Sequence, residues 1–504
     1  MRGRRVIIIG SGLGGLECGY ILAKNGMDVT VLERQRHIGG CLQSFHRRSG
    51  VFDTGMHYVG SLAEGESLGS LFRYFGLMDL PWKELDRDCF DEVVIGDESF
   101  AFANGHEEFA ARLTGRFPHE KDRIDRYVRL LKETGDNIFG FLYPDRWTSL
   151  SDSLFGRQAY GFLCECISDP LLRKVISGTS LKMELEAETL PLYTFAQIND
   201  SFIRSAWRLQ GSGSMIADSL ADSIRRMGGR VLPLKEARQI CESEAGVTGV
   251  MTSSGEFFEA DWVISDAHPA VTVSLASPEG RMRKSFRKRV ASAPNTSGMF
   301  TACFSLCKDS IPYLNRNQFI FNEDADPWSA PDGTVSRIMI SYPVPESFCA
   351  GGCQASGKVF ADRMDILTPC SWEEVSQWQG TQVGRRGDDY VRFKQKKIRN
   401  CLKIAERLVP GIADAVNEVY TSTPLTYQSY NLSPEGSAYG LRKDFRSPLL
   451  SVLSPQTPVD GLLMTGQSLN LHGVLGVSMT SLLTCGSILG MDRIREELRP
   501  YIIG

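Results

Sequence analysis

The sequence predicts an α/β fold that opens with a Rossmann-like unit, and three observations support this. An apolar run at residues 6–9 is followed by a glycine-rich turn at residues 10–15. A helical pattern then continues to Gly26, and a second apolar run follows at residues 29–32. Parallel strands that are buried on both faces appear as continuous apolar runs joined by a right-handed crossover. The order strand, glycine turn, helix, strand therefore predicts a βαβ unit that opens a doubly wound sheet.

Length, composition and charge place limits on the class of protein. The chain has 504 residues, of which 42% are apolar, so it can bury a sizeable core over more than one domain. Its formal net charge of −4 provides no positive field for a polyanion, and we expect no nucleic-acid partner. The thirteen cysteines are scattered along the chain and no two pairs have metal-ligand spacing, so we expect no metal.

The cellular compartment is predicted from the cysteines and from the ends of the chain. An odd number of scattered cysteines in a long chain is typical of a reducing compartment, and we expect a cytoplasmic protein. The apolar run behind the basic start is only four residues long, which is too short for a secretory leader. The weakly polar stretch 473–490 contains too many hydroxyl side chains for a membrane span.

The glycine turn matches the dinucleotide-binding pattern G-x-G-x-x-G. Gly10 permits the tight turn, Gly12 lets the backbone approach a pyrophosphate, and Gly15 permits close packing of helix on strand. The helix that follows directs its N-terminal amides at the phosphates. Glu33 ends the second strand, where a carboxylate accepts a hydrogen bond from a ribose hydroxyl and repels the 2′-phosphate of NADP.

A second glycine pair favours FAD over NAD at this site. Gly39 and Gly40 would let another loop approach a cofactor that extends across the domain. A second nucleotide-binding turn is not found, because Gly211 and Gly213 are followed by Ile216 where a third glycine is required. We therefore expect FAD as the resident cofactor, with NAD(P)H as a candidate transient electron donor.

The predicted fold class is a Rossmann-like FAD-binding domain of the glutathione reductase type with a discontinuous α+β substrate or cap domain. The pattern of strands and helices assigns residues 1–110, 205–284 and 456–504 to the FAD-binding domain. Residues 111–204 are expected to form a helical cap, and residues 285–455 to complete the substrate domain.

Several motifs resemble those of the phytoene desaturase-like flavoproteins, in particular the retinol saturase and carotenoid isomerase branch. They recur in the same order along nearly the whole chain. They are residues 10–15, Glu33, Gly39-Gly40, residues 52–60 (FDTGMHYVG), residues 263–267 (VISDA) with Pro269, residues 465–467 (TGQ) and residues 473–476 (GVLG).

The resemblance implies a non-covalent FAD under a cap, beside an apolar tunnel for a polyene or similar lipid. It implies that Glu33 and Arg34 contact the adenosine side, and that Ala237 meets the adenine through its backbone. The residues expected on the pyrophosphate and flavin are Gly10, Gly12, Gly14, Gly15, Gly39, Gly40, Gly466, Gln467, Val474 and Leu475.

Two histidines are candidate proton donors. His57 lies in the motif that the resemblance places near the flavin, where an imidazole can donate a proton, orient the substrate or simply pack. His472 is a second candidate, at a position where the branch often has an aliphatic residue. Gln467 stands where the wider superfamily has an acid, and Ser468 where the branch often has one; these departures bear on the substrate.

The leading functional hypothesis is a flavin-dependent saturase of a hydrophobic polyene. A desaturase or an isomerase would use the same residues, an amine oxidase shares the flavin fold, and a lipid-chain carrier on this fold would need no flavin. An apolar substrate predicts peripheral membrane contact, through the aromatic cap residues 127–162 with Arg146, Arg157 and Lys174 nearby.

Overall fold

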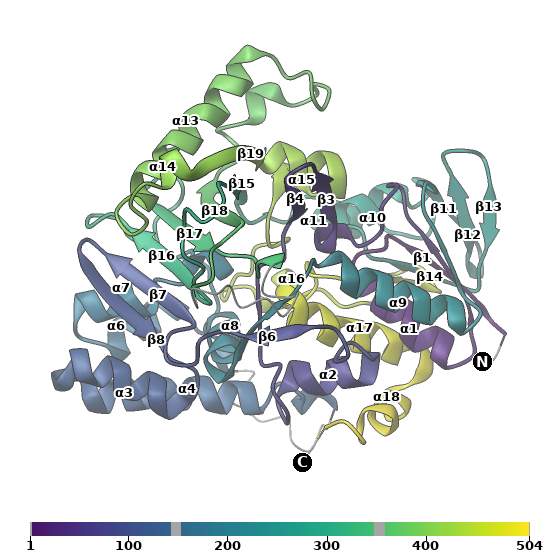
Figure 1. Cartoon of the computed structure of the whole chain (residues 1–504). Coiled ribbons are helices and arrows are strands. Elements are labelled where there is room, and N and C mark those ends of the chain that lie inside the picture. Colours follow the sequence, from purple (N-terminus) through teal and green to yellow (C-terminus); the bar gives the residue numbers. More distant parts are fainter. Residues whose placement is uncertain (1–2, 143–152, 347–357, 503–504) are drawn as a thin grey trace.

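The described residues of the computed structural model, 3–142, 153–346 and 358–502, confirm the predicted Rossmann-like sheet (Figure 1). Five parallel strands lie in the order β10-β2-β1-β14-β20. Their bounds are Arg230–Leu232 for β10, Asp28–Leu32 for β2, Arg5–Ile9 for β1, Trp262–Ser265 for β14 and Leu462–Met464 for β20. Three stretches that are far apart in the sequence therefore supply one sheet.

Alternate residues of β1 face two different layers, as expected for a strand buried on both sides. Val6 and Ile8 pack on helices α1, α9 and α17, and Ile7 and Ile9 pack on a layer that includes the small antiparallel sheet β11-β12-β13. The bounds are Leu13–Lys24 (α1), Ser214–Arg226 (α9), Gly473–Leu489 (α17), Ala237–Ser243 (β11), Gly246–Thr252 (β12) and Phe257–Glu259 (β13). The crossover from β10 to β14 thus runs through strands, where a doubly wound sheet would have a helix.

A seven-stranded sheet forms the other half of the molecule. Its order is β19-β15-β18-β17-β16-β7-β8, and all neighbours are antiparallel except β16 and β7. The bounds are Val416–Ser422 (β19), Gly298–Leu306 (β15), Arg363–Cys370 (β18), Arg337–Ser341 (β17), Asn317–Phe321 (β16), Asp91–Ile95 (β7) and Glu98–Phe102 (β8). Residues 1–110 therefore contribute β7 and β8 to this sheet, and the proposed domain boundary at residue 110 stays a prediction.

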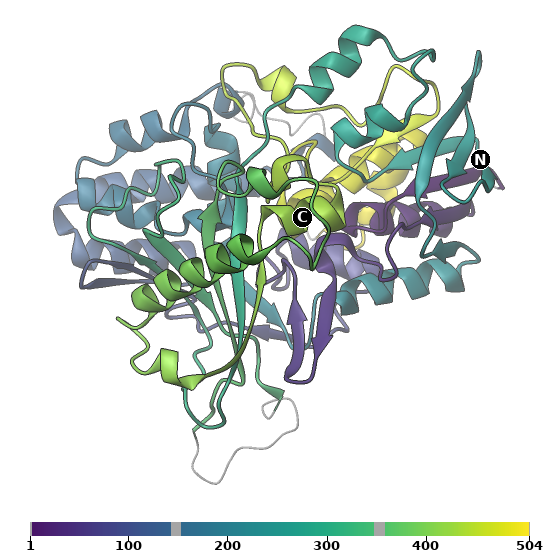
Figure 2. The same ribbon diagram turned by 90° about the horizontal axis from the view of Figure 1, so that it is seen from above.

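Helices cover both faces of the seven-stranded sheet, as Figure 2 shows from above, with the blue helices and the green α13 on opposite sides of the strands. Val93 and Phe319 face the first helical layer, while Val94 and Ile320 face α13. The bounds are His106–Arg116 (α3), Lys121–Asp136 (α4), Ala159–Cys166 (α6), Pro170–Ile176 (α7), Leu192–Arg204 (α8) and Asp388–Ala405 (α13).

Of the cap's aromatic residues that the structure describes, several belong to its core or pack against it. Tyr127 and Phe162 are buried, and Tyr160 is 37% exposed. Arg157 pairs with Glu165, and Arg146 lies outside the described residues. Within the described ranges, no helix combines the length and apolar character that a membrane-spanning segment requires.

Short elements connect the two halves. A three-stranded sheet in the order β5-β9-β6 pairs two strands from residues 59–84 with β9, the strand that follows helix α8. The bounds are Ser44–Arg47 (β3), Gly50–Asp53 (β4), Val59–Gly60 (β5), Trp82–Glu84 (β6), Ala206–Leu209 (β9), Ser67–Phe75 (α2), Pro269–Leu275 (α10), Lys284–Ala291 (α11), Pro424–Asn431 (α15) and Met491–Leu498 (α18).

Candidate functional site

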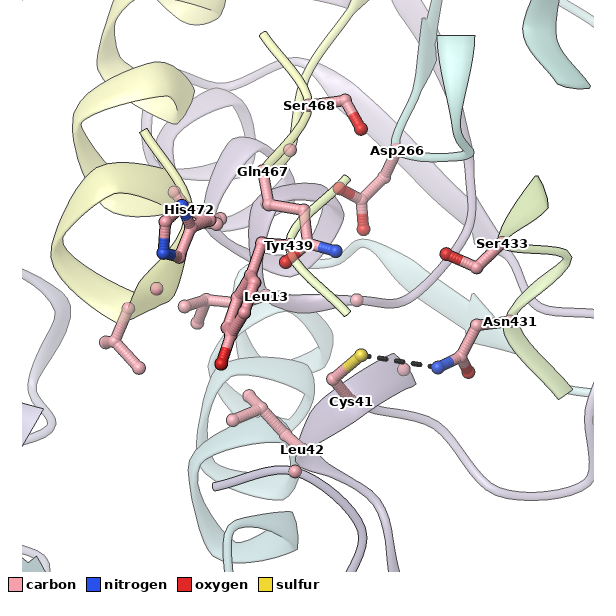
Figure 3. Close-up of a pocket in the computed structure, with 18 of the residues that line it drawn as sticks. Leu13, Cys41, Leu42, Asp266, Asn431, Ser433, Tyr439, Gln467, Ser468 and His472 are labelled. Atoms are coloured by element: carbon pink, nitrogen blue, oxygen red, sulfur yellow. Dashed lines mark hydrogen bonds between the residues drawn. The ribbon is translucent and has the colours of Figure 1, made fainter. Parts of the chain in front are cut away.

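A cavity of about 700 Å³ lies between the two halves of the molecule (Figure 3). Its first wall is formed by the glycine turn, the end of β2, the loop at residues 39–43 and the start of α17. Its second wall is formed by α8 and by the face of β15, β17 and β18. All fifteen residues that the sequence predicts for the cofactor and for proton transfer, except Gly15, line this cavity; Gly15 lies directly behind it.

The glycines of the first wall approach one another more closely than side chains would allow. Gly10 and Gly40 have φ angles of +96° and +56°. A Cβ on Gly40 would lie 3.1 Å from the Cα of Gly12, and a Cβ on Gly14 would lie 3.1 Å from the Cα of Gly466. A Cβ on Gly15 would collide with the carbonyl oxygen of Gly10. This backbone-lined hollow at the N-terminus of α1 fits a pyrophosphate.

Glu33 holds the glycine turn against the following loop. Its Oε2 accepts hydrogen bonds from the amide and the hydroxyl of Ser11, at 3.1 and 2.6 Å. The Gly39 amide in turn donates to the carbonyl oxygen and to the hydroxyl of Ser11, at 3.0 and 3.2 Å. Glu33 is only 7% exposed and lines the cavity, at the strand end where the sequence predicts ribose binding.

Arg34 and Ala237 border the same end of the cavity. The Arg34 guanidinium donates to the carbonyl oxygens of Ser429 and Tyr430, so it ties β2 to α15. Ala237 is the first residue of β11.

The segment at residues 466–475 places the start of α17 at the opposite end of the cavity. The backbone turns at Gly466 with a φ of +95°. The side-chain amide Nε2 of Gln467 donates to the carbonyl oxygen of Ala438 at 3.5 Å. No side chain caps α17, so its first amides are free to bind a negatively polarised group. Val474 and Leu475, in the first turn, line the cavity.

His472 is fixed in a neutral state beside this helix. Its Nε2 lies 3.0 Å from the carbonyl oxygen of Lys182, and its ring packs against Tyr439 in a tilted arrangement with the centroids 4.6 Å apart (Figure 3). Burial lowers the pKa of His472 to about 4. A carbonyl can only accept, so Nε2 carries the ring proton and donates it to Lys182.

His57 has a carboxylate partner that the sequence did not reveal. Its Nδ1 lies 3.5 Å from Oδ2 of Asp365, and the two side chains are 11% and 4% exposed. Oδ1 of Asp365 has no hydrogen-bond partner among the described residues. Asp53 lies nearby and accepts from the Gly213 amide at 2.8 Å, and burial raises its pKa to about 7. His57 also lines the cavity.

A buried polar network fixes the residue next to His57. The ammonium group of Lys182 pairs with Oδ2 of Asp91 at 2.7 Å, and the hydroxyl of Tyr58 donates to the same oxygen at 2.9 Å. Asn317 donates to Oδ1 of Asp91, also at 2.9 Å. The Lys182 ammonium also lies 4.3 Å from the ring centroid of Phe202. Because each charge has a partner, we assign this network to holding Tyr58 and the adjoining loop in place.

The second wall of the cavity is apolar. Side chains from α8 and from the facing strands supply it: Ile198, Phe202, Met299, Met339 and Leu367. The cavity therefore joins a backbone-lined polar hollow to an apolar chamber, an arrangement that suits a dinucleotide beside an apolar molecule.

The close contact at Gly15 provides a test of the cofactor site. We predict that Gly15→Ala abolishes dinucleotide binding, because the new methyl group meets the Gly10 carbonyl, and that it destabilises the fold by about 1–3 kcal/mol. Gly115→Ala in α3 is the matched control, since a Cβ there meets nothing within 4 Å. Cofactor absorbance and Tm of the purified proteins measure both effects. A Gly15→Ala protein with a full complement of cofactor would contradict this account of the site.

Known proteins share this organisation. Residues 8–75 match the family model of an NAD(P)-binding Rossmann-like domain. The chain is 28% identical to the all-trans-retinol 13,14-reductase of Danio rerio, over 96% of this chain and 85% of the relative. It is 22% identical to the chloroplastic prolycopene isomerase of Daucus carota, over 98% and 81% of the two chains.

A solved structure of putrescine oxidase with bound putrescine superimposes with a TM-score of 0.65 at 15% identity, over 97% of this chain and 99% of that chain. A likeness at this level of identity shows a shared fold, whereas the sequence relatives align over nearly the whole of this chain. The chain is therefore an oxidoreductase related over nearly its whole length to all-trans-retinol 13,14-reductase and to prolycopene isomerase, in agreement with the branch that its motifs resemble.

Proposed function

We propose that this protein is an FAD-dependent saturase that reduces one carbon-carbon double bond of a hydrophobic conjugated polyene. The observation that carries the proposal is the single cavity that joins the glycine hollow to the apolar chamber. The printed activities of the sequence relatives, a retinol reductase and a prolycopene isomerase, support a polyene substrate.

The residues present fit FAD. The pyrophosphate would lie in the hollow formed by Gly12, Gly14 and Gly40. The adenosine would lie beside Glu33 and Ala237. The isoalloxazine ring would lie at the start of α17, against the residues Gly466, Gln467, Val474 and Leu475. When bound and reduced, FAD supplies hydride to the substrate carbon. The apolar wall excludes water from that carbon, and the free amides of α17 stabilise negative charge on the adjoining ring edge.

The structure favours His57 over His472 as the group that protonates the second carbon. The ring proton of His472 is committed to the Lys182 carbonyl, and its pKa of about 4 keeps it from carrying a second proton near neutral pH. His57 lies beside the buried carboxylate of Asp365, and it lines the cavity. In this proposal His57 is the catalytic acid, Asp365 positions it, and His472 orients the start of α17.

We predict that His57→Gln lowers kcat for polyene reduction by about 10²–10⁴-fold, because the proton must then come from solvent. Flavin binding and flavin reduction should be unchanged. Asp365→Asn should cause a smaller loss of kcat with an unchanged KM for the polyene, since it removes only the group that positions the imidazole. His119→Gln, at a mostly exposed histidine, is the control. Equal kcat values and pH profiles for the His57 variant and wild type would refute this role.

An anaerobic spectral experiment tests the reaction itself. The flavin is reduced with dithionite, a polyene such as retinol is added, and both spectra are followed. A saturase reoxidises its flavin while the polyene loses one conjugated double bond. Rearrangement of the polyene with the flavin still reduced would identify an isomerase, and reaction only with oxidised flavin would identify a desaturase. If the polyene is unchanged with both reduced and oxidised flavin, polyene chemistry is refuted and amines should be tested next. NADH or NADPH in place of dithionite tests the proposed transient donor.

A lipid carrier is disfavoured because the glycine hollow is intact and would serve no purpose without a dinucleotide. A colourless purified protein that binds no FAD would reverse this choice. We also propose peripheral membrane contact, which rests on the apolar substrate alone because Tyr127 and Phe162 of the cap are buried. Flotation with liposomes tests it, and a protein that remains entirely in the aqueous fraction would contradict it.

A further inference from the structure

An acidic side chain points into the glycine hollow. Asp266 follows β14, and Figure 3 shows its carboxylate turned toward the centre of the cavity. Its Oδ1 lies 2.7 Å from the position that a Cβ would take on Gly14, and at the same distance from that position on Gly466. Its Oδ2 occupies the space of a Cβ on Gly12. The glycines predicted to receive the pyrophosphate therefore surround a carboxyl group.

The surroundings of Asp266 contain acids and no cationic partner. Glu33 at the end of β2 raises the pKa of Asp266, and no described residue forms an ion pair with it. Glu17 in α1 is fully buried and accepts hydrogen bonds from Ser478 and Ser481, at 2.6 and 3.0 Å. Burial raises the pKa of Glu17 to about 8 and that of the Cys41 thiol to about 11, so both are largely protonated near neutral pH.

Two further titratable groups lie in this region, His268 and Lys443. The buried Lys443 ammonium donates to the carbonyl oxygens of Ser451, Ser468 and Leu469, and burial lowers its pKa to about 7. His268, at the start of α10, accepts a hydrogen bond from the Ala270 amide at 3.2 Å, and burial lowers its pKa to about 4. An ionised Asp266 would therefore face a doubly charged pyrophosphate across a buried hollow without a compensating side chain. Like charges at contact in a partly buried site are repelled by several kcal/mol at an effective dielectric of about 20.

We infer that Asp266 is a cofactor-binding residue that meets the FAD pyrophosphate as a protonated carboxyl group, so that FAD binding takes up one proton. The inference rests on FAD being the cofactor, as proposed above. A neutral carboxyl can donate its O–H to a phosphate oxygen while its other oxygen accepts from the backbone amides at the start of α1. The proton comes from solvent, and no bond is made or broken in the cofactor.

The pKa of Asp266 in the free protein agrees with this assignment. Burial is the first cause of its rise to about 7, and the Glu33 charge adds to it, while the amides of Gly15 and Gly12 oppose it. A raised pKa means that the protonated form predominates below about pH 7 and is lost as the pH rises. If only the protonated form accepts FAD, affinity falls by up to about tenfold for each pH unit above 7.

The test measures FAD binding to the apoprotein from pH 6 to pH 9 by quenching of FAD fluorescence. Wild type should have a Kd that is constant below pH 7 and rises by up to about tenfold per unit above it. Asp266→Asn, which stays neutral, should bind with a Kd independent of pH and more tightly than wild type at pH 9. Glu17→Gln, which removes the other buried acid of this region, should keep the wild-type slope.

A proton count separates the possible failures. With a pH indicator in weak buffer at pH 8, wild type should take up close to one proton per FAD bound, and Asp266→Asn should take up none. A flat wild-type Kd, or equal slopes and proton uptake in wild type and Asp266→Asn, overturns the inference while leaving FAD as the cofactor. Failure of wild type to bind FAD even at pH 6 would instead overturn the proposed function. The wild-type measurements decide the question even if the variant does not fold.

Discussion

The close approach of three backbone segments around the carboxyl group of Asp266 is the constraint on which the site depends. The glycine turn, the loop at Gly40 and the end of β20 at Gly466 come together at distances that a single methyl group would disturb. Glycine carries an entropic cost of about 0.5–1 kcal/mol in regular structure, and here the parallel pairing of β1 with β2 and β14 offsets it. The contact keeps the N-termini of α1 and α17 directed at one hollow, where they can share a single cofactor.

The other half of the molecule supplies the chamber and its buried charges. Lys182 and Asp91 form a satisfied pair that holds Tyr58, and Asp365 extends from the centre of β18 toward His57. Both carboxylates come from the seven-stranded sheet, whereas Tyr58 and His57 follow the glycine-rich half. The position of His57 thus depends on how the two halves pack against each other, so the cofactor and the proton donor are positioned by the same interface.

The cofactor half was predictable because its signals are local. The spacing of Gly10, Gly12 and Gly15, with Glu33 at the next strand end, determines turn, helix and strand within one short stretch. The partners Asp365 and Lys182 were not predictable, because they meet His57 and Tyr58 only through the order of strands in the large sheet. Asp266 lay within a recognised motif, yet its role depends on glycines that are distant in sequence. The sequence did not indicate whether the aromatic residues of the cap face the core, a tunnel or the surface.

The central claim is that one cavity holds both the cofactor and an apolar substrate, with the reactive ring at the start of α17. A crystal structure of the protein with FAD and a polyene analogue measures this directly. The account predicts pyrophosphate density between Gly12 and Gly40, the flavin ring beside Val474 and Leu475, and the analogue against Met299 and Met339. The account would be contradicted by a flavin ring placed away from α17, or by an analogue bound outside the chamber.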